Sequence, residues 1–317
     1  MNIEIVPYTE EHEAIWDSFC EQALNATFLH TYRFLSYHGD RFKNLSVLIM
    51  ESGKVVGIFP AAESLIDPSL IISHPGITYG GIVHQGRLTG LRMLDALKAL
   101  SEYYGLAGYE RLEYKAIPFI YPRSPSQDDL YALFQLGAKR TRCDLSSTID
   151  LVNRQKISER RRRGKRKAEK VVTLSSDSEL LGDLWNVITQ NLASKHDAKP
   201  VHSISDIGLI IERFPKEVTI RCALMDNIVE AGIILFNSPV VWHAQYIAAS
   251  KKAYSVSALD AVFSSVISEA ENAGARYFDF GTSNEKSGKI LNDGLYRFKC
   301  EFGGGGVVHE YYELRLG

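Results

Sequence analysis

The stretch RYFDFGTSNEKSGKILNDGLYRFKCEFGGGG, residues 276–306, is the part of the chain from which the fold can be argued outward. RYFDFG is short and aromatic and ends on Gly281, which predicts a buried strand that breaks into a loop. Residues 287–300 are expected to form a helix, because apolar side chains recur at helical spacing: Ile290, Leu291, Leu295 and Phe298. Residues 307–316, VVHEYYELRL, alternate and predict a closing strand.

Lys299 lies near the end of that expected helix, directly after Phe298 and shortly before four glycines at 303–306. A strand, a polar loop and a helix that ends in a cation beside glycines could build a site for an anion or an oxyanion. The alternative interpretation is a surface lysine that precedes a run of glycines used for close backbone packing. The residue types alone leave both interpretations open.

The chain repeats the same order of patterns at an offset of 169 residues. Trp16 and Trp185 lie on expected helices at 11–23 and 178–192, and Gly105 and Gly274 each close a later expected helix. Hairpins are expected at 46–59 and 221–235, and strands at 109–118 and 275–284. Four matching elements and two equal offsets predict a tandem duplication.

Each repeat is expected to run helix, hairpin, strand, helix, strand, helix, strand, which suits an α+β fold with a mixed sheet flanked by helices. The two expected domains are residues 1–148 and 149–317, and they join near residues 144–153. The chain has 317 residues, enough for two domains that each bury a core.

Residues 153–170, NRQKISERRRRGKRKAEK, open the second expected domain with ten basic residues against two glutamates. The segment favours a helix but has almost no apolar stripe, so it cannot be a core helix. Three interpretations stay open: a solvated basic face, a clamp for substrate phosphate, or a contact with nucleic acid. If the segment binds phosphate, Arg162 or Arg166 is expected to make the contact.

Bulk composition excludes several classes of protein. The hydrophobic share of 45% and the charged share of 23% indicate a globular protein, and the net charge of −2 argues against a polyanion-binding surface over the whole molecule. No apolar run is long enough for a membrane span, and the N-terminus does not resemble a signal peptide. The four cysteines are scattered, which predicts a reduced, cytoplasmic protein without a structural zinc site or any other metal.

Several segments resemble the Fem-type transferases. RRRGKRKAEK (161–170) is similar to the basic segment that opens their second domain, and GLYRFKCEFGG (294–304) is similar to their FK-x-x-FGG motif. FLHTYRF (28–34), HPGITYGG (74–81) and IPFIYP (117–122) extend the resemblance into the first half. The resemblance implies two tandem domains of the GNAT (N-acyltransferase) fold around a cleft, and an N-acyltransferase activity connected with bacterial envelope polysaccharides.

The resemblance also bears on the donor of the acyl group. GNAT enzymes with the usual coenzyme A loop carry [RQ]-x-x-G-x-[GA] before their central helix, whereas this chain has ASKKAYSVSA at 249–258, without a glycine. Lys251, Lys252 and Ser255 are the candidates for holding donor phosphate there. Fem-type transferases draw aminoacyl groups from tRNA, so the expected donors are acyl-CoA or aminoacyl-tRNA, and no tightly bound cofactor is expected.

Acyl transfer to an amine needs a proton acceptor and donors for the oxyanion. Lys299 is the candidate donor to the oxyanion, with Phe298 supporting it from below, and His243 or Asp279 is the candidate base. The other candidates are for substrate binding: His196, His202, Tyr246, Tyr79, Asn284, Arg162 and Arg166. For His243 and Asp279, and for the tyrosines, an ordinary structural role is the alternative.

The sequence therefore predicts a cytoplasmic N-acyltransferase that acts on an amino group of an envelope-glycan precursor, such as an amino sugar linked to a nucleotide or a lipid. The alternative is a non-catalytic protein that binds a phosphorylated glycan or RNA through its cleft and the basic segment. Neither alternative fixes the oligomeric state.

Overall fold

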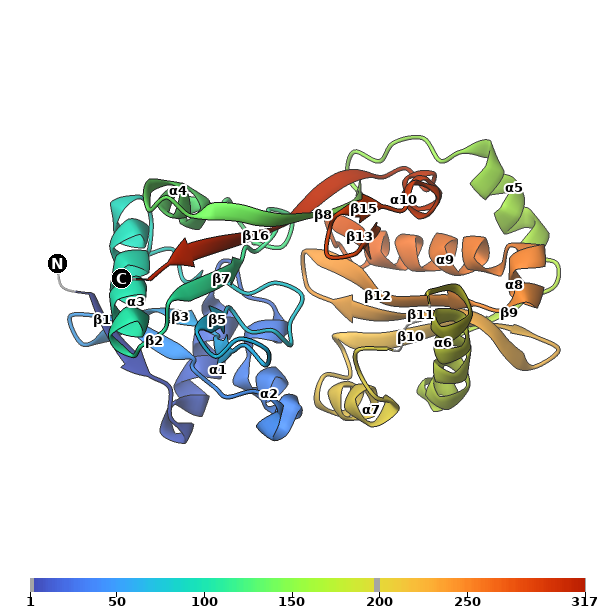
Figure 1. Cartoon of the computed structure of the whole chain (residues 1–317). Helices are drawn as coiled ribbons and strands as arrows, with labels where there is room; N and C mark the ends of the chain where they lie inside the picture. Colours follow the sequence, from blue (N-terminus) through green and yellow to red (C-terminus); the bar gives the residue numbers. More distant parts are fainter. Residues whose placement is uncertain (1–2, 197–199, 317) are drawn as a thin grey trace. The chain divides into compact units, whose positions relative to one another are not determined.

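The computed structural model of the protein describes residues 3–196 and 200–316 (Figure 1). Within them the chain divides into two compact units. The first comprises Met1–Leu145, Asn284–Ile290 and Val308–Gly317, and the second comprises Ser146–Ser283 and Leu291–Val307. The expected domains, 1–148 and 149–317, were defined by the sequence repeat, and that division remains a prediction. The compact units are not contiguous, because the last strand pairs with a strand of the first unit at Tyr311↔Lys115.

The first unit contains a four-stranded sheet of order β1-β2-β3-β6 and a second group of strands of order β4-β5-β7-β16-β8. Its strands are β1 (Ile3–Pro7), β2 (Val47–Glu51), β3 (Lys54–Phe59), β4 (Ala62–Glu63), β5 (Leu70–Ile72), β6 (Val83–His84) and β7 (Arg111–Lys115). Two long strands, β8 (Lys139–Asp150) and β16 (Gly305–Arg315), contribute residues to both units. The helices are α1 (Glu13–Gln22), α2 (Tyr32–Leu35), α3 (Leu91–Leu106) and α4 (Asp128–Gln135), with short 3-10 turns at Glu10–His12, Phe28–His30 and Ser36–Arg41.

Helix α3 forms because apolar residues follow one helical face, and all of that face is buried in the first unit's core: Met93, Ala96, Leu97, Leu100 and Tyr104. The expected hairpin at 46–59 is confirmed by β2 and β3, which pair antiparallel. Gly105 was expected to close α3, but it lies inside the helix. Gly108, with φ +91°, follows the end, because only glycine adopts that backbone conformation at little cost.

The second unit is one mixed sheet of order β8-β13-β12-β11-β10-β9 with helices on both faces (Figure 1). Its strands are β9 (Thr173–Ser175), β10 (Val218–Met225), β11 (Ile228–Asn237), β12 (Val241–Ala249) and β13 (Tyr277–Thr282). The helices are α5 (Glu159–Ala168), α6 (Leu181–His196), α7 (Ile204–Arg213), α8 (Lys251–Val256), α9 (Ala258–Asn272) and α10 (Asp293–Cys300), with a 3-10 turn at Ser178–Leu180.

Strand β11 explains why this sheet is covered twice. Ile233 and Leu235 pack in the core cluster that includes α9, whereas Gly232, on the opposite face, lies so close to α6 that an added Cβ would be 2.7 Å from Leu184. Successive residues of a strand point to opposite faces, so a strand that is apolar throughout needs a helix on each side. The α+β class with a mixed sheet and flanking helices is confirmed.

One expected element is wrong in its extent. Residues 287–300 were expected to form one helix, but Ile290–Leu291 form the short strand β15, which pairs with β14 (Asn284–Glu285), and only Asp293–Cys300 is helical. Asn292 caps α10, because its side-chain oxygen accepts a hydrogen bond from the Leu295 amide at 3.0 Å. A cap at this position starts the helix late, although the apolar spacing extends further back.

Candidate functional site

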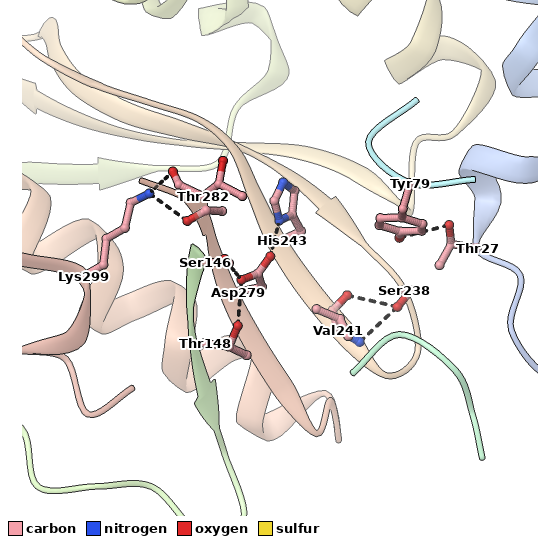
Figure 2. A network of polar contacts seen from close by, with 11 residues as sticks. Thr27, Tyr79, Ser146, Thr148, Ser238, Val241, His243, Asp279, Thr282 and Lys299 are labelled. Carbon is pink, nitrogen blue, oxygen red and sulfur yellow. Dashed lines mark hydrogen bonds and ion pairs between the residues drawn. The ribbon is translucent and has the colours of Figure 1, made fainter. Parts of the chain in front are cut away.

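His243 and Asp279 lie at the point where two parallel strands stop pairing. Strands β12 and β13 share three parallel rungs, and His243↔Asp279 is the last of them. Beyond it β12 continues to Ala249 and β13 to Thr282 without further pairing to each other. Figure 2 shows both side chains at this position. The two residues predicted as alternative bases are therefore partners in one arrangement.

Asp279 is fully buried and holds three side chains. Its Oδ2 atom lies 2.8 Å from Nδ1 of His243, and its Oδ1 atom accepts hydrogen bonds from Thr148 at 2.8 Å and from Ser146. A carboxylate only accepts hydrogen bonds, so Nδ1 of His243 carries the proton. In the neutral ring Nε2 is then the basic nitrogen, and this is the arrangement in which a histidine accepts a proton from a nucleophile.

Lys299 of α10 points its ammonium at the end of β13 (Figure 2). Nζ donates to the carbonyl oxygens of Gly281 and Thr282, both at 2.8 Å, and the residue is 3% exposed. Burial lowers the pKa of Lys299 to about 8. An ammonium has three N–H donors, so these two carbonyl contacts leave one donor for a further group.

Gly281 joins these two features. Its carbonyl binds Lys299, and a Cβ added to it would lie 3.2 Å from Cε1 of the His243 ring. Its φ of +74° is in the left-handed region, and the pairing of β13 with β8 is irregular between Asp279 and Thr282. The irregular pairing places Gly281 so that its carbonyl accepts from the lysine and its α-carbon side is closed by the histidine ring.

Phe298, the residue before Lys299, belongs to an aromatic cluster rather than to an open surface. Its ring centroid lies 6.2 Å from that of Phe263 and 5.4 Å from that of Phe302. The glycines after it approach other backbone closely, as expected: a Cβ on Gly303 would lie 2.3 Å from the carbonyl oxygen of Gln155, and one on Gly304 would lie 2.8 Å from that of Thr148. These contacts fix α10 in the second unit.

The basic segment forms α5, and its buried cation is neither of the two arginines expected to bind phosphate. Arg161 is buried and forms ion pairs with Asp260 at 2.6 Å and Glu301 at 2.9 Å. Arg162 is half-buried and pairs with Glu159, and Arg166 is exposed. The buried face of α5 consists of Arg161, Gly164 and Ala168. These residues recur at helical spacing, and two of them are small, so the sequence contained a signal that this face is buried.

The predicted acceptor-side residues His202 and Tyr246 are in contact. Nδ1 of His202 lies 2.7 Å from the hydroxyl of Tyr246, and the Trp185 ring meets the Tyr246 ring edge-on at 5.3 Å. Burial raises the pKa of Tyr246. His196 is the last residue of α6, and its side chain lies outside the described part of the structure.

The predicted donor loop at 249–258 is a short helix, α8. Ser250 caps it by accepting from the Ala253 amide at 3.1 Å. Lys252 forms ion pairs with Asp226 at 3.1 Å and Glu230 at 3.8 Å. The hydroxyl of Ser255 donates to the Lys252 carbonyl at 2.7 Å, and Lys251 is exposed. Of the three candidates for donor phosphate, two therefore have protein partners.

Tyr79 and Asn284 belong to the first unit. Tyr79 is buried, donates to the Thr27 hydroxyl at 3.2 Å and packs on Tyr121 at 4.3 Å. Asn284 accepts from the Leu145 amide at 2.6 Å and donates to the Gly288 carbonyl at 3.3 Å. These contacts give both residues a structural role in that unit.

Within residues 3–196 and 200–316, no group of three or more His, Cys, Asp or Glu side chains is placed to hold a metal ion. Over the same described ranges, every helix is too short or too polar to cross a membrane.

Residues 152–299 match the family model described as an acetyltransferase (GNAT) domain. The match covers somewhat less than half of the chain and most of the second unit. This range contains His243, Asp279 and Lys299, so the histidine–aspartate pair and the buried ammonium lie inside the matched range. No curated protein sequence matches the chain.

The structure resembles several solved structures over nearly its whole length. FemX has a TM-score of 0.68 at 13% identity, with 99% of this chain and 97% of FemX covered. L-PGS from Bacillus licheniformis has a TM-score of 0.64 at 13% identity, with 98% and 93% covered. A tandem GNAT protein of the clavulanic acid biosynthesis pathway has a TM-score of 0.54 at 11% identity, with 100% and 99% covered. The chain has the Fem-type tandem GNAT fold.

Proposed function

We propose that this acyltransferase moves an acyl or aminoacyl group onto the amino group of an envelope-glycan precursor, such as an amino sugar linked to a nucleotide or a lipid. The observation that carries the proposal is the arrangement around Gly281, whose carbonyl accepts from a buried ammonium and beside which the His243 ring leaves no room for a side chain. A proton acceptor beside a cation is what the aminolysis of an ester or thioester needs.

In the proposed reaction the neutral amine attacks the carbonyl carbon of the donor and forms the C–N bond. His243 takes the proton that the nitrogen loses, with Asp279 holding its ring by the 2.8 Å contact to Nδ1. The tetrahedral oxyanion is stabilised by the remaining N–H of Lys299. Its collapse breaks the C–S bond of a thioester or the C–O bond of an aminoacyl ester, and the leaving group takes the proton from His243.

The pair of His202 and Tyr246 supports a sugar as part of the acceptor. An aromatic ring that carries a hydroxyl, with a histidine 2.7 Å away, offers both a stacking face and hydrogen-bonding groups. The exposed Arg166 and the half-buried Arg162 of α5 are proposed to contact the phosphate of the nucleotide or lipid carrier. The donor is either acyl-CoA or aminoacyl-tRNA.

The test is product formation with defined substrates. The protein is incubated with an amino-sugar nucleotide and, in separate reactions, with acetyl-CoA or charged tRNA, and the products are analysed by mass spectrometry. We expect the mass of one acyl or aminoacyl group to be added, and His243→Gln to lower the rate by about 10²- to 10⁴-fold. Binding of the acceptor without transfer from either donor would favour the non-catalytic binding protein.

A further inference from the structure

Helix α5 has a residue that the proposed reaction does not use. All residues of α5 are described, and among its cations Arg161 alone is buried, at 7% exposed. A buried charge needs compensating partners, because its transfer from water is costly. Arg161 has two carboxylates as partners, Asp260 in the first turn of α9 and Glu301 directly after α10.

Arg161 contacts three residues that flank Lys299 in the sequence. The guanidinium lies 4.7 Å from the Phe298 ring centroid and 5.8 Å from that of Phe302, while its Nε atom lies 2.9 Å from Oε2 of Glu301. Residues 298, 301 and 302 are thus held by one side chain. Since Lys299 and Phe298 are neighbours on α10, the position of the lysine backbone depends on these contacts.

The guanidinium of Arg161 also contacts helix α9. Nη1 of Arg161 donates to Oδ1 of Asp260 at 2.6 Å. Gly164, one turn further along α5, lies so close that a Cβ there would be 1.7 Å from Oδ2 of the same aspartate. A planar fork that binds a carboxylate on each side and stacks on aromatic rings is a property of arginine that lysine does not share. Arg161 therefore links α10 to α9.

We infer that Arg161 is a positioning residue that holds α10 against α9, so that the Lys299 ammonium stays on the carbonyl oxygens of Gly281 and Thr282. The catalytic consequence rests on the function proposed above for Lys299. The positioning itself does not, because it concerns the burial of one ammonium. The basic segment then has two roles on two faces: an inner arginine that fixes the site, and outer cations that face solvent.

The experiment measures the reactivity of two buried lysines in the same sample. The folded protein is labelled with an amine-reactive ester, and the labelling rates of Lys299 and Lys115 are followed by peptide mass spectrometry. Lys115 is also buried, donates to the His74 carbonyl at 3.0 Å and to that of Ile77, and belongs to the first unit, so it reports on general unfolding. In Arg161→Gln we expect the ratio of Lys299 to Lys115 labelling to rise on the order of tenfold, which corresponds to about 1.4 kcal/mol less free energy for local opening.

Arg163→Gln, an exposed change on the same helix, is the matched control and is expected to leave the ratio unchanged. Arg161→Lys keeps the charge and decides the matter if Arg161→Gln does not fold; a single ammonium cannot reproduce both ion pairs, so the ratio should rise by a smaller factor. An unchanged ratio in folded Arg161→Gln and Arg161→Lys would overturn the inference, and so would an equal rise for both lysines. A raised ratio in Arg161→Gln, together with no acyl transfer by the unaltered protein from either donor, would leave the positioning intact while the proposed function fails.

Discussion

Gly281 is the residue on which the geometry of the candidate site depends most directly. Its carbonyl accepts from Lys299 at 2.8 Å, and its α-carbon faces the His243 ring. The sequence marked it as the end of a strand. It could not show that a left-handed φ at this position brings a lysine and a histidine from two other elements to one residue.

Gly281→Ala tests this role. The new methyl group would lie 3.2 Å from the His243 ring, so the ring must shift by a few tenths of an ångström. A displacement of about 1 Å at a reacting group can cost on the order of 10² in rate, so a smaller loss of rate is expected here. Gly274→Ala is the matched control, because Gly274 has a similar φ of +79° but no atom within 4 Å of an added Cβ. Both variants should lose about 1–2 kcal/mol of unfolding free energy, since alanine is strained in this backbone region. Equal activity of the two variants in a steady-state assay would contradict the assigned role.

At the scale of elements, the parallel pairing of β12 and β13 brings His243 and Asp279 together, which the sequence left undecided. His243 and Asp279 were alternatives because each sits on its own predicted strand. Parallel register is set by packing of α9 and by long-range pairing, and neither is encoded in local periodicity. The hairpins and the amphipathic helices, whose signals are local, were correctly predicted, whereas the start of α10 depended on the Asn292 cap.

Asp279→Asn tests the strand pairing as a functional unit. An amide at this position can donate a hydrogen bond to Nδ1 and stabilise the tautomer in which Nε2 carries the proton, so kcat should fall by about 10³- to 10⁴-fold. Thr148→Val removes one of the hydrogen bonds to the carboxylate and leaves its charge, so a smaller loss is expected. Steady-state rates of both variants, with thermal unfolding as the check on folding, decide the matter. Similar rates for Asp279→Asn and the unaltered protein would exclude the pair from the chemistry.

Helix α5 allows a separate prediction about charge. Arg166 is exposed, while Arg162 already pairs with Glu159. Arg166→Ala should therefore weaken the binding of a phosphorylated acceptor more than Arg162→Ala does. Exposed charge contacts are screened over about 10 Å at 0.1 M salt, so the difference should shrink as salt is added. Titration calorimetry at two salt concentrations measures it, and an unchanged Kd for Arg166→Ala would leave the outer cations as a solvated face.

At the scale of the whole molecule, the segment 153–170 carries eight net positive charges, which leaves ten net negative charges on the remaining residues.

The tandem fold was predictable because each unit repeats strong local patterns and because two short motifs resemble the Fem-type transferases. The return of β16 to the first unit was not predictable, since an alternating strand does not specify its partner.

The segment between β12 and α9 predicts how tightly the protein binds coenzyme A. The segment 250–257 is largely the helix α8 instead of a glycine-containing loop, and the first turn of α9 is buried with the carboxylate of Asp260 in it. A helix N-terminus favours a pyrophosphate only where its first turn is open to the ligand, whereas here that turn is buried and its Asp260 carboxylate is paired with Arg161. Coenzyme A should thus bind weakly at 250–257. Tight, saturable binding of acyl-CoA that is lost on mutation of Lys251 or Lys252 would show the reverse.

We propose that the second unit carries the acyl-transfer chemistry, and two buried lysines of similar character, one in each unit, allow a direct test. Burial lowers the pKa of both Lys299 and Lys115 to about 8. Below pH 8 each buried ammonium costs the folded state roughly 3 kcal/mol, and this cost is relieved as the pH rises from 8 towards 10.5. Lys→Met at either position removes that cost and also leaves two carbonyl groups without a donor, so the two variants should change stability by similar amounts.

The deciding measurement is the pH profile of kcat/KM for Lys299→Met and Lys115→Met. If the Lys299 ammonium stabilises the oxyanion, kcat/KM of the unaltered protein falls as the pH rises above about 8. Lys299→Met should lose this alkaline fall and be slower by about 10²- to 10³-fold at neutral pH. Lys115→Met should keep both the rate and the alkaline fall. A rate for Lys299→Met within a few-fold of the unaltered protein, or an equal loss in Lys115→Met, would exclude a specific role of the Lys299 ammonium in the chemistry.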